Sequence, residues 1–401
     1  MDRRKYTALF AFVKAVPDPR KAQGKVYPWE FLLLGVCGAL LSGQQTGSAI
    51  ADWVAAHAQE IAAFLGIHLR RIPSHSTLRR ALRYMDVEAL ERIIAEHNRT
   101  LEMEDLASAT VTGADGRPLC GWAIDDKEVR GAGAHGSKVH LLSIVQHRSG
   151  ITVAQQQIEE KTNEIPMVPE LLAGRDLRGK VITLDALNTQ RATAQRILDQ
   201  GGDYLMIVKE NQRAMYADTE TFFQATLLPQ EDDRDTYTYS GKGHGRLETR
   251  TLTCSAGLGD YLGWPGAKQV AMRCCQRVDT KSGKVTREIT YVVTSLDRKR
   301  AGARQLEALW RGHWTIENRD HYVRDVTMLE DRCQMHKGNA PHALAALKNG
   351  LLAALRHHGW GNIAAAIRHF AVSARRALAF LTGRAPGRRS ARVAKAFPDP
   401  A

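Results

Sequence analysis

The sequence has few cysteines and no long apolar run, and both shortages exclude classes of protein. Its 401 residues include six cysteines, none in a C-x-x-C pair or with zinc-finger spacing. Structural zinc is therefore not expected, and the thiols are expected to be reduced. The longest apolar run, Phe31–Leu41, is far shorter than the ~18 residues needed to cross a bilayer. No signal-type segment follows Met1. These features predict a cytoplasmic protein with no membrane partner.

Acidic residues are also fewer than basic residues. The chain has 43 Asp and Glu against 56 Lys and Arg, which gives a net charge of +13 and a pI of about 9.6. Such an excess usually indicates a polyanionic partner, most often nucleic acid. A membrane surface is the alternative, but no basic amphipathic helix stands apart from the rest of the chain. The hydrophobic share of 44% and the charged share of 25% are typical of a soluble protein, and the length predicts two or three domains.

Residues 1–110 are predicted to form a helical domain. The segment Trp29–Leu41 is apolar nearly all round, which indicates a buried helix. Five arginines (Arg70, Arg71, Arg79, Arg80 and Arg83) surround a turn at Pro73–Thr77. This basic corner either binds DNA or is simply a solvated face.

Two strands are predicted to end on a carboxylate. The β-branched run Val181–Leu184 ends on Asp185 and precedes a helix at Arg191–Asp199. The run Cys120–Ile124 ends on Asp125 in the same way. Open α/β sheets place their chemistry at such strand ends. The alternative for Asp185 is that it caps the next helix.

The order of elements over residues 118–212 is three strands joined by short turns, followed by α-β-α-β. This order predicts an α/β fold with an RNase H-like sheet, in which the first and fourth strands lie parallel and adjacent. Asp125 and Asp185 would then meet at one end of the sheet and could hold Mg²⁺ together. The alternative is that they are two unrelated surface aspartates.

Residues 213–300 are predicted to be a β-rich insertion in this domain. Within it, His244, Arg246 and Arg250 either face a phosphate backbone or lie on the surface of a hairpin. Residues 301–355 are predicted to close the RNase H-like core, beginning with one long helical stretch, Ala301–Asp331. Residues 356–401 are predicted to be a basic, disordered helical tail.

The long helical stretch carries a patterned set of side chains. Trp310, His313, Glu317 and Arg324 are spaced three, four and seven residues apart, so in an α-helix they share one face. Their chemistry predicts that this face does not point into the core. If the helix packs beside the sheet end, Glu317 becomes a third carboxylate ligand.

From about Phe10 to about Leu355 the chain resembles DDE transposases of the H-repeat-associated (ISAs-type) insertion-sequence family. The matching pieces are Pro17-Asp-Pro-Arg20 with Gly24, Ala123-Ile-Asp-Asp-Lys127 with Arg130, Lys161-Thr-Asn-Glu-Ile165, Asp185-Ala with Thr189-Gln190, Gly202-Asp-Tyr-Leu205, Val208-Lys-Glu-Asn-Gln212, Gly243-His-Gly-Arg246 with Glu248, Trp264-Pro-Gly266, and His313-Trp-Thr-Ile-Glu-Asn318 with Glu330-Asp331. Each piece is weak alone, and the ordered set is specific.

The resemblance implies that Asp125, Asp185 and Glu317 form a metal-binding catalytic triad. It also places Trp310, His313, Glu317 and Arg324 on the aromatic-x-x-base-x-x-x-Glu-x(6)-base signature of a wider transposase group. The sequence departs from the family at Asp126, where Gly is usual, and at Asp320 and Arg324, where Leu is usual. Two consecutive residues, Asp125 and Asp126, therefore carry a carboxylate at the position of the first ligand.

The resemblance implies a cytoplasmic, nucleoid-associated DNA transposase. It would cleave and transfer strands of an insertion sequence with two Mg²⁺ ions, for which Mn²⁺ could substitute. Its partners would be double-stranded transposon ends and target DNA, bound by a homodimer. The expected DNA contacts are Lys209, Arg246, Trp310, His313 and Arg324. The alternatives are a nuclease or resolvase of the same fold, or a domesticated DNA-binding protein without chemistry.

Overall fold

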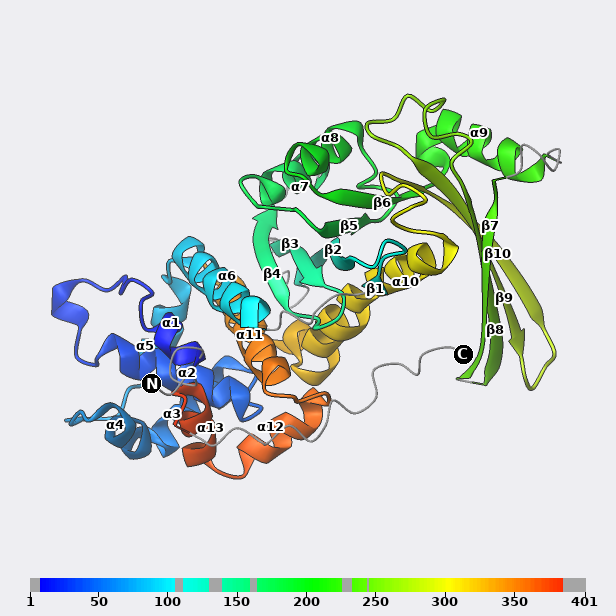
Figure 1. The fold of residues 1–401 in the computed structure, drawn as a ribbon. Coiled ribbons are helices and arrows are strands. Elements are labelled where there is room, and N and C mark those ends of the chain that lie inside the picture. The colour runs from blue at the N-terminus through cyan, green and yellow to red at the C-terminus, as the bar shows by residue number, and fades with distance from the viewer. Residues whose placement is uncertain are drawn as a thin grey trace.

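A ten-stranded sheet with helices on both faces lies beside a bundle of helices (Figure 1). The computed structural model describes residues 8–104, 111–129, 139–158, 164–225, 233–243 and 245–384. Within them, no helix combines the length and apolar character that crossing a bilayer requires.

The first half of the sheet has the pairing that the sequence predicts. Its strands are β1 (Val111–Thr112), β2 (Pro118–Val129), β3 (Val139–Gln146), β4 (Thr152–Ile158), β5 (Lys180–Leu184) and β6 (Asp203–Val208). They lie in the order β4-β3-β2-β5-β6, with β1 paired to β2. Strands β2 and β5, the first and fourth of the predicted set, are parallel neighbours with Ile124 opposite Leu184. This pairing brings their carboxyl ends to the same edge of the sheet.

The β-rich insertion continues this sheet. It contains β7 (Asp235–Gly243), β8 (Arg246–Ser255), β9 (Gln269–Asp279) and β10 (Val285–Thr294). Strand β10 pairs antiparallel with β6, with Tyr291 opposite Val208. The order β10-β9-β8-β7 then extends the sheet outward, as Figure 1 shows at the right.

Helices cover both faces of the sheet. On one face α7 (Glu164–Leu172) and α8 (Arg191–Asp199) bury Leu172 and Ile197 in a cluster with Ile124, and α9 (Arg213–Gln224) packs against β10. On the other face α10 (Ala303–His313) buries Leu306 in a cluster with Val181. Successive residues on a strand point to opposite faces of the sheet. Helices cover this sheet on both sides, so apolar side chains of its strands occupy both faces.

Both ends of the chain build the helical part. Its N-terminal members are α1 (Leu9–Val13), α2 (Trp29–Leu41), α3 (Gly47–Ala56), α4 (Ala58–Leu65), α5 (His75–Arg83) and α6 (Val87–Glu104). The C-terminal members are α11 (Ala340–His357), α12 (Ile363–Ala371) and α13 (Ala374–Leu381). Helix α2 has the predicted bounds and is buried except at Glu30. Helix α11 contacts α6 and α5 as well as β4, so it joins the bundle to the sheet.

Residues 356–384 are mostly helical, as predicted for the tail over 356–401, but the prediction that the tail is disordered is wrong for them. Helix α13 packs against α2 and α4, and Ala377 and Leu378 are fully buried there. Residues 385–401, with Arg388, Arg389, Arg392 and Lys395, lie outside the described residues. The sequence did not show the packing of α13, because the pattern of a short amphipathic helix predicts which face is buried but not which helices cover it.

The stretch Ala301–Asp331 is helical over most of its length, as predicted, but it is not one regular α-helix. Helix α10 ends at His313 and is followed by two π-helical segments, η5 (Ile316–His321) and η6 (Val323–Thr327), and by the short 3₁₀ helix η7 (Glu330–Arg332). A π-turn holds more residues than an α-turn, so side chains spaced for an α-helix do not stay on one face. Buried residues recur instead at Ile316, Asp320, Arg324 and Met328.

Candidate active site

Asp125 and Asp185 lie at the same level of two neighbouring parallel strands. Asp185 directly follows β5, whereas Asp125 lies within β2: the prediction that this strand ends on Asp125 is wrong, because β2 continues to Val129 in its pairing with β3. Ile124 and Leu184 are register partners, so the residue that follows each of them is at the same level of the sheet. Side chains alternate along a strand. Asp125 therefore shares a face with Ala123, which packs on Ile316, and Asp185 shares a face with Thr183, which contacts His313. Both carboxylates thus face the side of the sheet that α10 and η5 cover.

Uncompensated negative charge surrounds Asp125. Burial and the charges of Asp126, Asp185 and Glu317 raise the pKa of Asp125 to about 8, although the backbone N–H of Asp126 donates to its Oδ1 at 3.0 Å. Asp126 points to the opposite face, where its Oδ2 lies 3.6 Å from Nδ1 of His140. Asp125, and not the extra carboxylate at 126, is therefore the residue that faces Asp185 and Glu317.

A tight loop holds Asp185 in place. Its Oδ1 accepts hydrogen bonds from the backbone N–H and from Nδ2 of Asn188, at 3.0 and 3.1 Å. The hydroxyl of Thr189 donates to the carbonyls of Asp185 and of Ile207 on β6, at 2.9 and 2.6 Å. Helix α8 begins after Gln190, so Asp185 does not cap it. The sequence analysis did not identify Asn188. The available signal was its position three residues after Asp185, because an aspartate side chain commonly accepts a hydrogen bond from a backbone N–H in its own turn.

Glu317 reaches the site from η5. That segment contacts β2 and β3, and the fully buried Ile316 seats it against Ala123 and Val145. The Glu317 side chain is exposed, yet its charge contributes to the raised pKa of Asp125. The three predicted acids therefore come together in one region of the fold.

The chemistry of these donors fits a hard divalent cation that also binds phosphate. Within the described part of the chain, no three His, Cys, Asp or Glu side chains are close enough to hold a metal ion by themselves. Mg²⁺ is commonly held by one or two carboxylates with waters and substrate phosphates, and not by an all-protein cage. Burial first, and then the charges of Asp126, Asp185 and Glu317, raise the pKa of Asp125, and a bound cation would favour its ionised form.

A buried chain of hydrogen bonds fixes His313 beside Asp185. The Thr183 hydroxyl lies 2.9 Å from Nε2 of His147 and 3.0 Å from Nδ1 of His313. Burial lowers the pKa of His313 to about 4, although the charge of Asp185 acts in the opposite direction. His313 is therefore neutral at physiological pH. The DNA contact expected at His313 is therefore corrected to that of a neutral hydrogen-bonding group.

Trp310 and Arg324 are not placed to touch DNA. Trp310 is 1% exposed, and the guanidinium carbon of Arg273 lies 4.0 Å from its ring centroid. Arg324 is fully buried and donates to both carboxylate oxygens of Glu330, at 2.7 to 3.1 Å. The prediction that the face carrying Trp310, His313 and Arg324 does not point into the core is wrong: Trp310 and His313 are buried on α10 itself, and Arg324 is buried in η6.

Arg324 instead ties the segment that carries Glu317 to the rest of the fold. Its Nη1 lies 3.4 Å from Oδ2 of Asp320 and 3.0 Å from Oε1 of Gln155 on β4. The two departures from the family pattern, Asp320 and Arg324, thus form an ion pair with each other. Burying either charge alone would be strongly unfavourable, so the two residues replace an apolar pair together.

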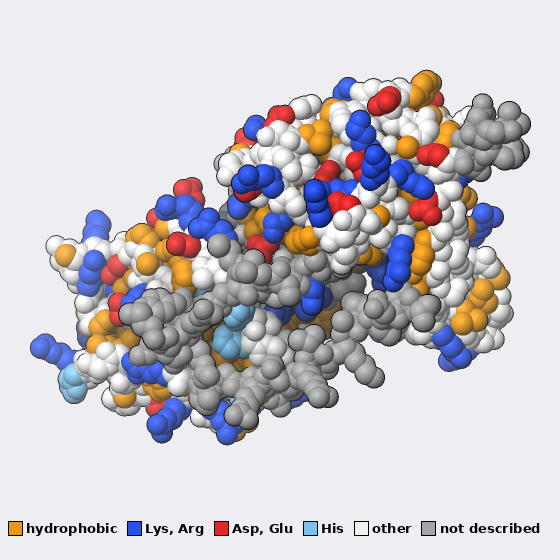
Figure 2. All heavy atoms as spheres, viewed as in Figure 1, with side chains coloured by type: hydrophobic (Ala, Val, Ile, Leu, Met, Phe, Trp, Pro, Cys, Tyr) orange, Lys and Arg blue, Asp and Glu red, His pale blue; other side chains and the backbone are white. Residues whose placement is uncertain are grey.

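Lys209 and Arg246 remain accessible. Lys209 follows β6 directly, at the same sheet edge as Asp185, and is exposed. Arg246 begins β8 in the insertion, and its side chain is 48% exposed with Glu248 3.8 Å away. Five residues of the family motifs (Arg130, Lys161, Thr162, Asn163 and His244) lie outside the described residues. Figure 2 shows basic side chains spread over both the bundle and the sheet on one face of the molecule.

Comparison with known proteins agrees with this geometry. The family model described as the transposase DDE domain matches residues 116–354, and the DDE_Tnp_1-associated model matches residues 10–98. The chain is 30% identical to "H repeat-associated putative transposase YhhI" of Escherichia coli K12 over 350 residues, which is 85% of this chain and 88% of that protein.

Two further relatives cover similar stretches. "Putative transposase YncI" of Escherichia coli O157:H7 is 29% identical over 357 residues, 87% of each chain. An "Uncharacterized protein in dhlA 3'region" of Xanthobacter autotrophicus is 32% identical over 293 residues, 71% of this chain and 93% of that protein. The matched transposase domain covers more than half of the chain and contains all three acids. The chain therefore belongs to the DDE transposase family.

Proposed function

We propose that this protein cleaves the ends of an insertion sequence and joins them to target DNA by a two-metal mechanism on an RNase H-like sheet. The observation that carries the proposal is the placement of Asp125 and Asp185 at the same level of adjacent parallel strands, with Glu317 close enough to act on the pKa of Asp125. The strand order β4-β3-β2-β5-β6 supports the RNase H-like assignment.

Asp125, Asp185 and Glu317 would hold the Mg²⁺ ions, or Mn²⁺ in their place. When bound, such ions activate the attacking oxygen and stabilise the leaving oxygen of a phosphodiester. The protein's own residues supply positioning. Asn188 fixes the Asp185 carboxylate through two hydrogen bonds to one oxygen, which leaves Oδ2 of Asp185 for the metal.

Neutral His313 completes the positioning. Its Nδ1 is held by Thr183, so the ring orientation next to Asp185 is set before DNA arrives. A preorganised polar group of this kind costs little reorganisation during the reaction. His313 would hydrogen-bond a phosphate oxygen or a bound water, without a permanent positive charge.

DNA is the proposed partner, bound in the cytoplasm at the nucleoid. The net charge of +13 and the exposed Lys209 beside the catalytic sheet edge support a phosphate-binding surface there, and Arg246 extends it onto the insertion. Two copies on paired ends are the arrangement that we propose. The intact set of carboxylates disfavours a DNA-binding protein without chemistry.

A joining assay tests this function. Purified protein, Mg²⁺ and a supercoiled target plasmid are incubated with duplex ends of the native element, pre-cleaved to expose a 3′-hydroxyl. Joined products are expected only with Mg²⁺ or Mn²⁺. Hydrolysis of the intact element without any joining from pre-cleaved ends would identify a nuclease or resolvase instead. Binding with neither reaction would identify a protein without chemistry.

A further inference from the structure

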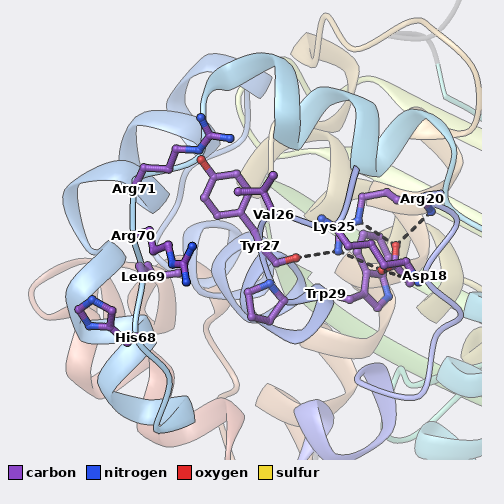
Figure 3. A pocket seen from close by; sticks show the side chains of 11 residues that line it. Asp18, Arg20, Lys25, Val26, Tyr27, Trp29, His68, Leu69, Arg70 and Arg71 are labelled. Atoms are coloured by element: carbon purple, nitrogen blue, oxygen red, sulfur yellow. Dashed lines mark hydrogen bonds and ion pairs between the residues drawn. The ribbon is translucent and has the colours of Figure 1, made fainter. Parts of the chain in front are cut away.

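The helical part contains a cavity that the catalytic site does not use. It has a volume of about 670 Å³, within the range of known ligand pockets. Its walls are the segment from Asp18 to Trp29, between α1 and α2, and the loop from His68 to Arg71, between α4 and α5. Figure 3 shows the arginines of the second loop on one side and the Asp18, Arg20 and Lys25 group on the other. We call it the basic cavity.

The lining of the basic cavity is strongly positive. Its charged residues are four cations, Arg20, Lys25, Arg70 and Arg71, and one anion, Asp18. Their net charge is +3 when His68 is neutral. The rest of the wall is mostly apolar, including Val26, Tyr27 and Leu69. A concave surface with charges of one sign and low-dielectric walls concentrates the electric field. An anion is therefore the ligand that this cavity favours.

The single anion in the wall is already neutralised. Asp18 accepts from Nε and Nη2 of Arg20 at 2.8 and 3.0 Å, and Nζ of Lys25 is 3.6 Å away. Partial burial would raise the pKa of Asp18, but its hydrogen bonds with Arg20 and the charges of Arg20 and Lys25 lower it. Asp18 thus stays ionised and orients Arg20, which also donates to the carbonyl of Tyr27 at 2.8 Å.

Arg70 and Arg71 are the cations left for a ligand. Both are exposed, and neither has an ion pair with another residue in the described ranges. The wall that presents them is fixed, because the Tyr27 hydroxyl donates to the carbonyl of Ile72 at 2.9 Å. Two free guanidinium groups on a fixed loop match the geometry of phosphate oxygens, which arginine binds through paired N–H donors.

We propose that the basic cavity binds backbone phosphates of duplex DNA through Arg70 and Arg71. The site is separate from the three catalytic acids, so it anchors DNA and takes no part in the chemistry. Phosphate contacts position a protein on DNA but do not read its sequence. The cavity would therefore increase the affinity for DNA and fix the position of the protein along the duplex, while other surfaces would determine base preference.

The test compares two variants with the same loss of charge. Arg70→Gln with Arg71→Gln removes the two free cations of the cavity. Arg79→Gln with Arg80→Gln removes two exposed arginines of α5 in the same part of the fold, outside the cavity. DNA affinity is measured by fluorescence anisotropy in EDTA over a range of salt concentrations. No cleavage occurs in EDTA, so the outcome is independent of the proposed catalytic function.

The cavity pair should weaken binding about tenfold at physiological salt and flatten the slope of log K against log salt by up to about two. The control pair should change affinity less than about twofold. Preference for element ends over scrambled duplex should stay the same in both. An equal loss in the two variants would show that only overall charge matters, and would overturn the proposal.

A second arm separates DNA from a small anion. Sodium tripolyphosphate is titrated into wild type and into the cavity variant, with heat of binding as the readout. Under the proposal tripolyphosphate competes with DNA for wild type, and both ligands lose affinity in the cavity variant. Loss of tripolyphosphate binding with unchanged DNA affinity would identify a small-polyphosphate site and overturn the DNA assignment. Circular dichroism of the variants confirms that they are folded.

Discussion

Gly312 packs so closely on His147 that a Cβ atom at position 312 would lie 2.2 Å from the ring's Nδ1. A Cβ at Gly121 on β2 would meet the same atom at 2.1 Å from the other side. The imidazole therefore occupies a slot between two glycines, and from there its Nε2 reaches Thr183. Glycine inside a helix costs roughly 1 kcal/mol relative to alanine. In α10 this cost is offset by the buried contact that it allows.

Gly312→Ala should therefore destabilise the protein although alanine is the better helix former. Overpacking a filled core costs about 1–3 kcal/mol, and we expect a loss of this size in the free energy of unfolding, measured by urea denaturation. Gly361→Ala is the control, because nothing lies within 4 Å of a Cβ at that position. In a His147→Ala background the cost of Gly312→Ala should shrink. An unchanged cost there would show that the ring is not the obstacle.

His313 should make stability depend on pH in the mildly acidic range. Burial lowers its pKa to about 4 in the folded state, against about 6.5 in an unfolded chain. Between these values the unfolded state binds a proton that the folded state does not, so stability rises with pH by up to about 1.4 kcal/mol per unit from this group. Urea unfolding from pH 4.5 to 7, in EDTA, measures the slope.

His313→Gln should flatten this slope, whereas His75→Gln, at an exposed position, should not. The contribution of His313 is complete above about pH 6.5 and is lost as the pH falls towards 4. A slope that is the same in wild type and in His313→Gln would contradict the burial of a neutral imidazole at this position.

Glu330 should be far more important to stability than an exposed acid with an arginine partner. Burial would raise its pKa, but the charges of Arg324 and Lys348 and the hydrogen bonds from Arg324 lower it to about 2. Glu330→Gln leaves Lys348 without its anion and Arg324 with Asp320 alone, and should cost about 3–5 kcal/mol in the free energy of unfolding.

The matched control for this variant is Glu288→Gln. Glu288 is 60% exposed and lies 3.0 Å from Arg277, so its loss should cost less than about 1 kcal/mol. Similar losses in Glu330→Gln and Glu288→Gln would show that the Arg324–Glu330 pair is not a structural tie between η6 and the core.

The sequence predicted the core of the fold from local signals. The strand before Asp185 is a short apolar run with clear boundaries. The strand predicted to end on Asp125 continues to Val129, but the parallel pairing of the two strands followed from the order of elements. The partner of α13 was not predictable, because Ala377 and Leu378 pack on helices more than 300 residues earlier in the chain. No local pattern encodes such a contact, and the basic composition after Arg384 pointed to a solvated tail instead.

The site was predicted in part. Asp185 and Glu317 lie close enough to Asp125 to act on its pKa, and their joint role as metal ligands stays a prediction. Of the expected DNA contacts, Trp310 and Arg324 are buried, whereas Lys209 and Arg246 are accessible. The error came from applying α-helical spacing to residues that form π-turns, which rotates Arg324 into the core. Asp320 carried a usable signal: an acid four residues before Arg324, both where leucine is usual, favours an internal ion pair over a DNA contact.

The most direct test of the account is Mg²⁺-dependent cleavage of element-end DNA by Asp125→Asn, Asp185→Asn and Glu317→Gln, with Asp126→Asn as the matched control. Each of the three should abolish cleavage while DNA binding is retained, and Asp126→Asn, whose side chain faces His140, should stay within about tenfold of wild type. If any one of the three keeps more than about a tenth of the wild-type rate, a barrier change below ~1.4 kcal/mol, that residue is not a metal ligand and the proposed active site is contradicted.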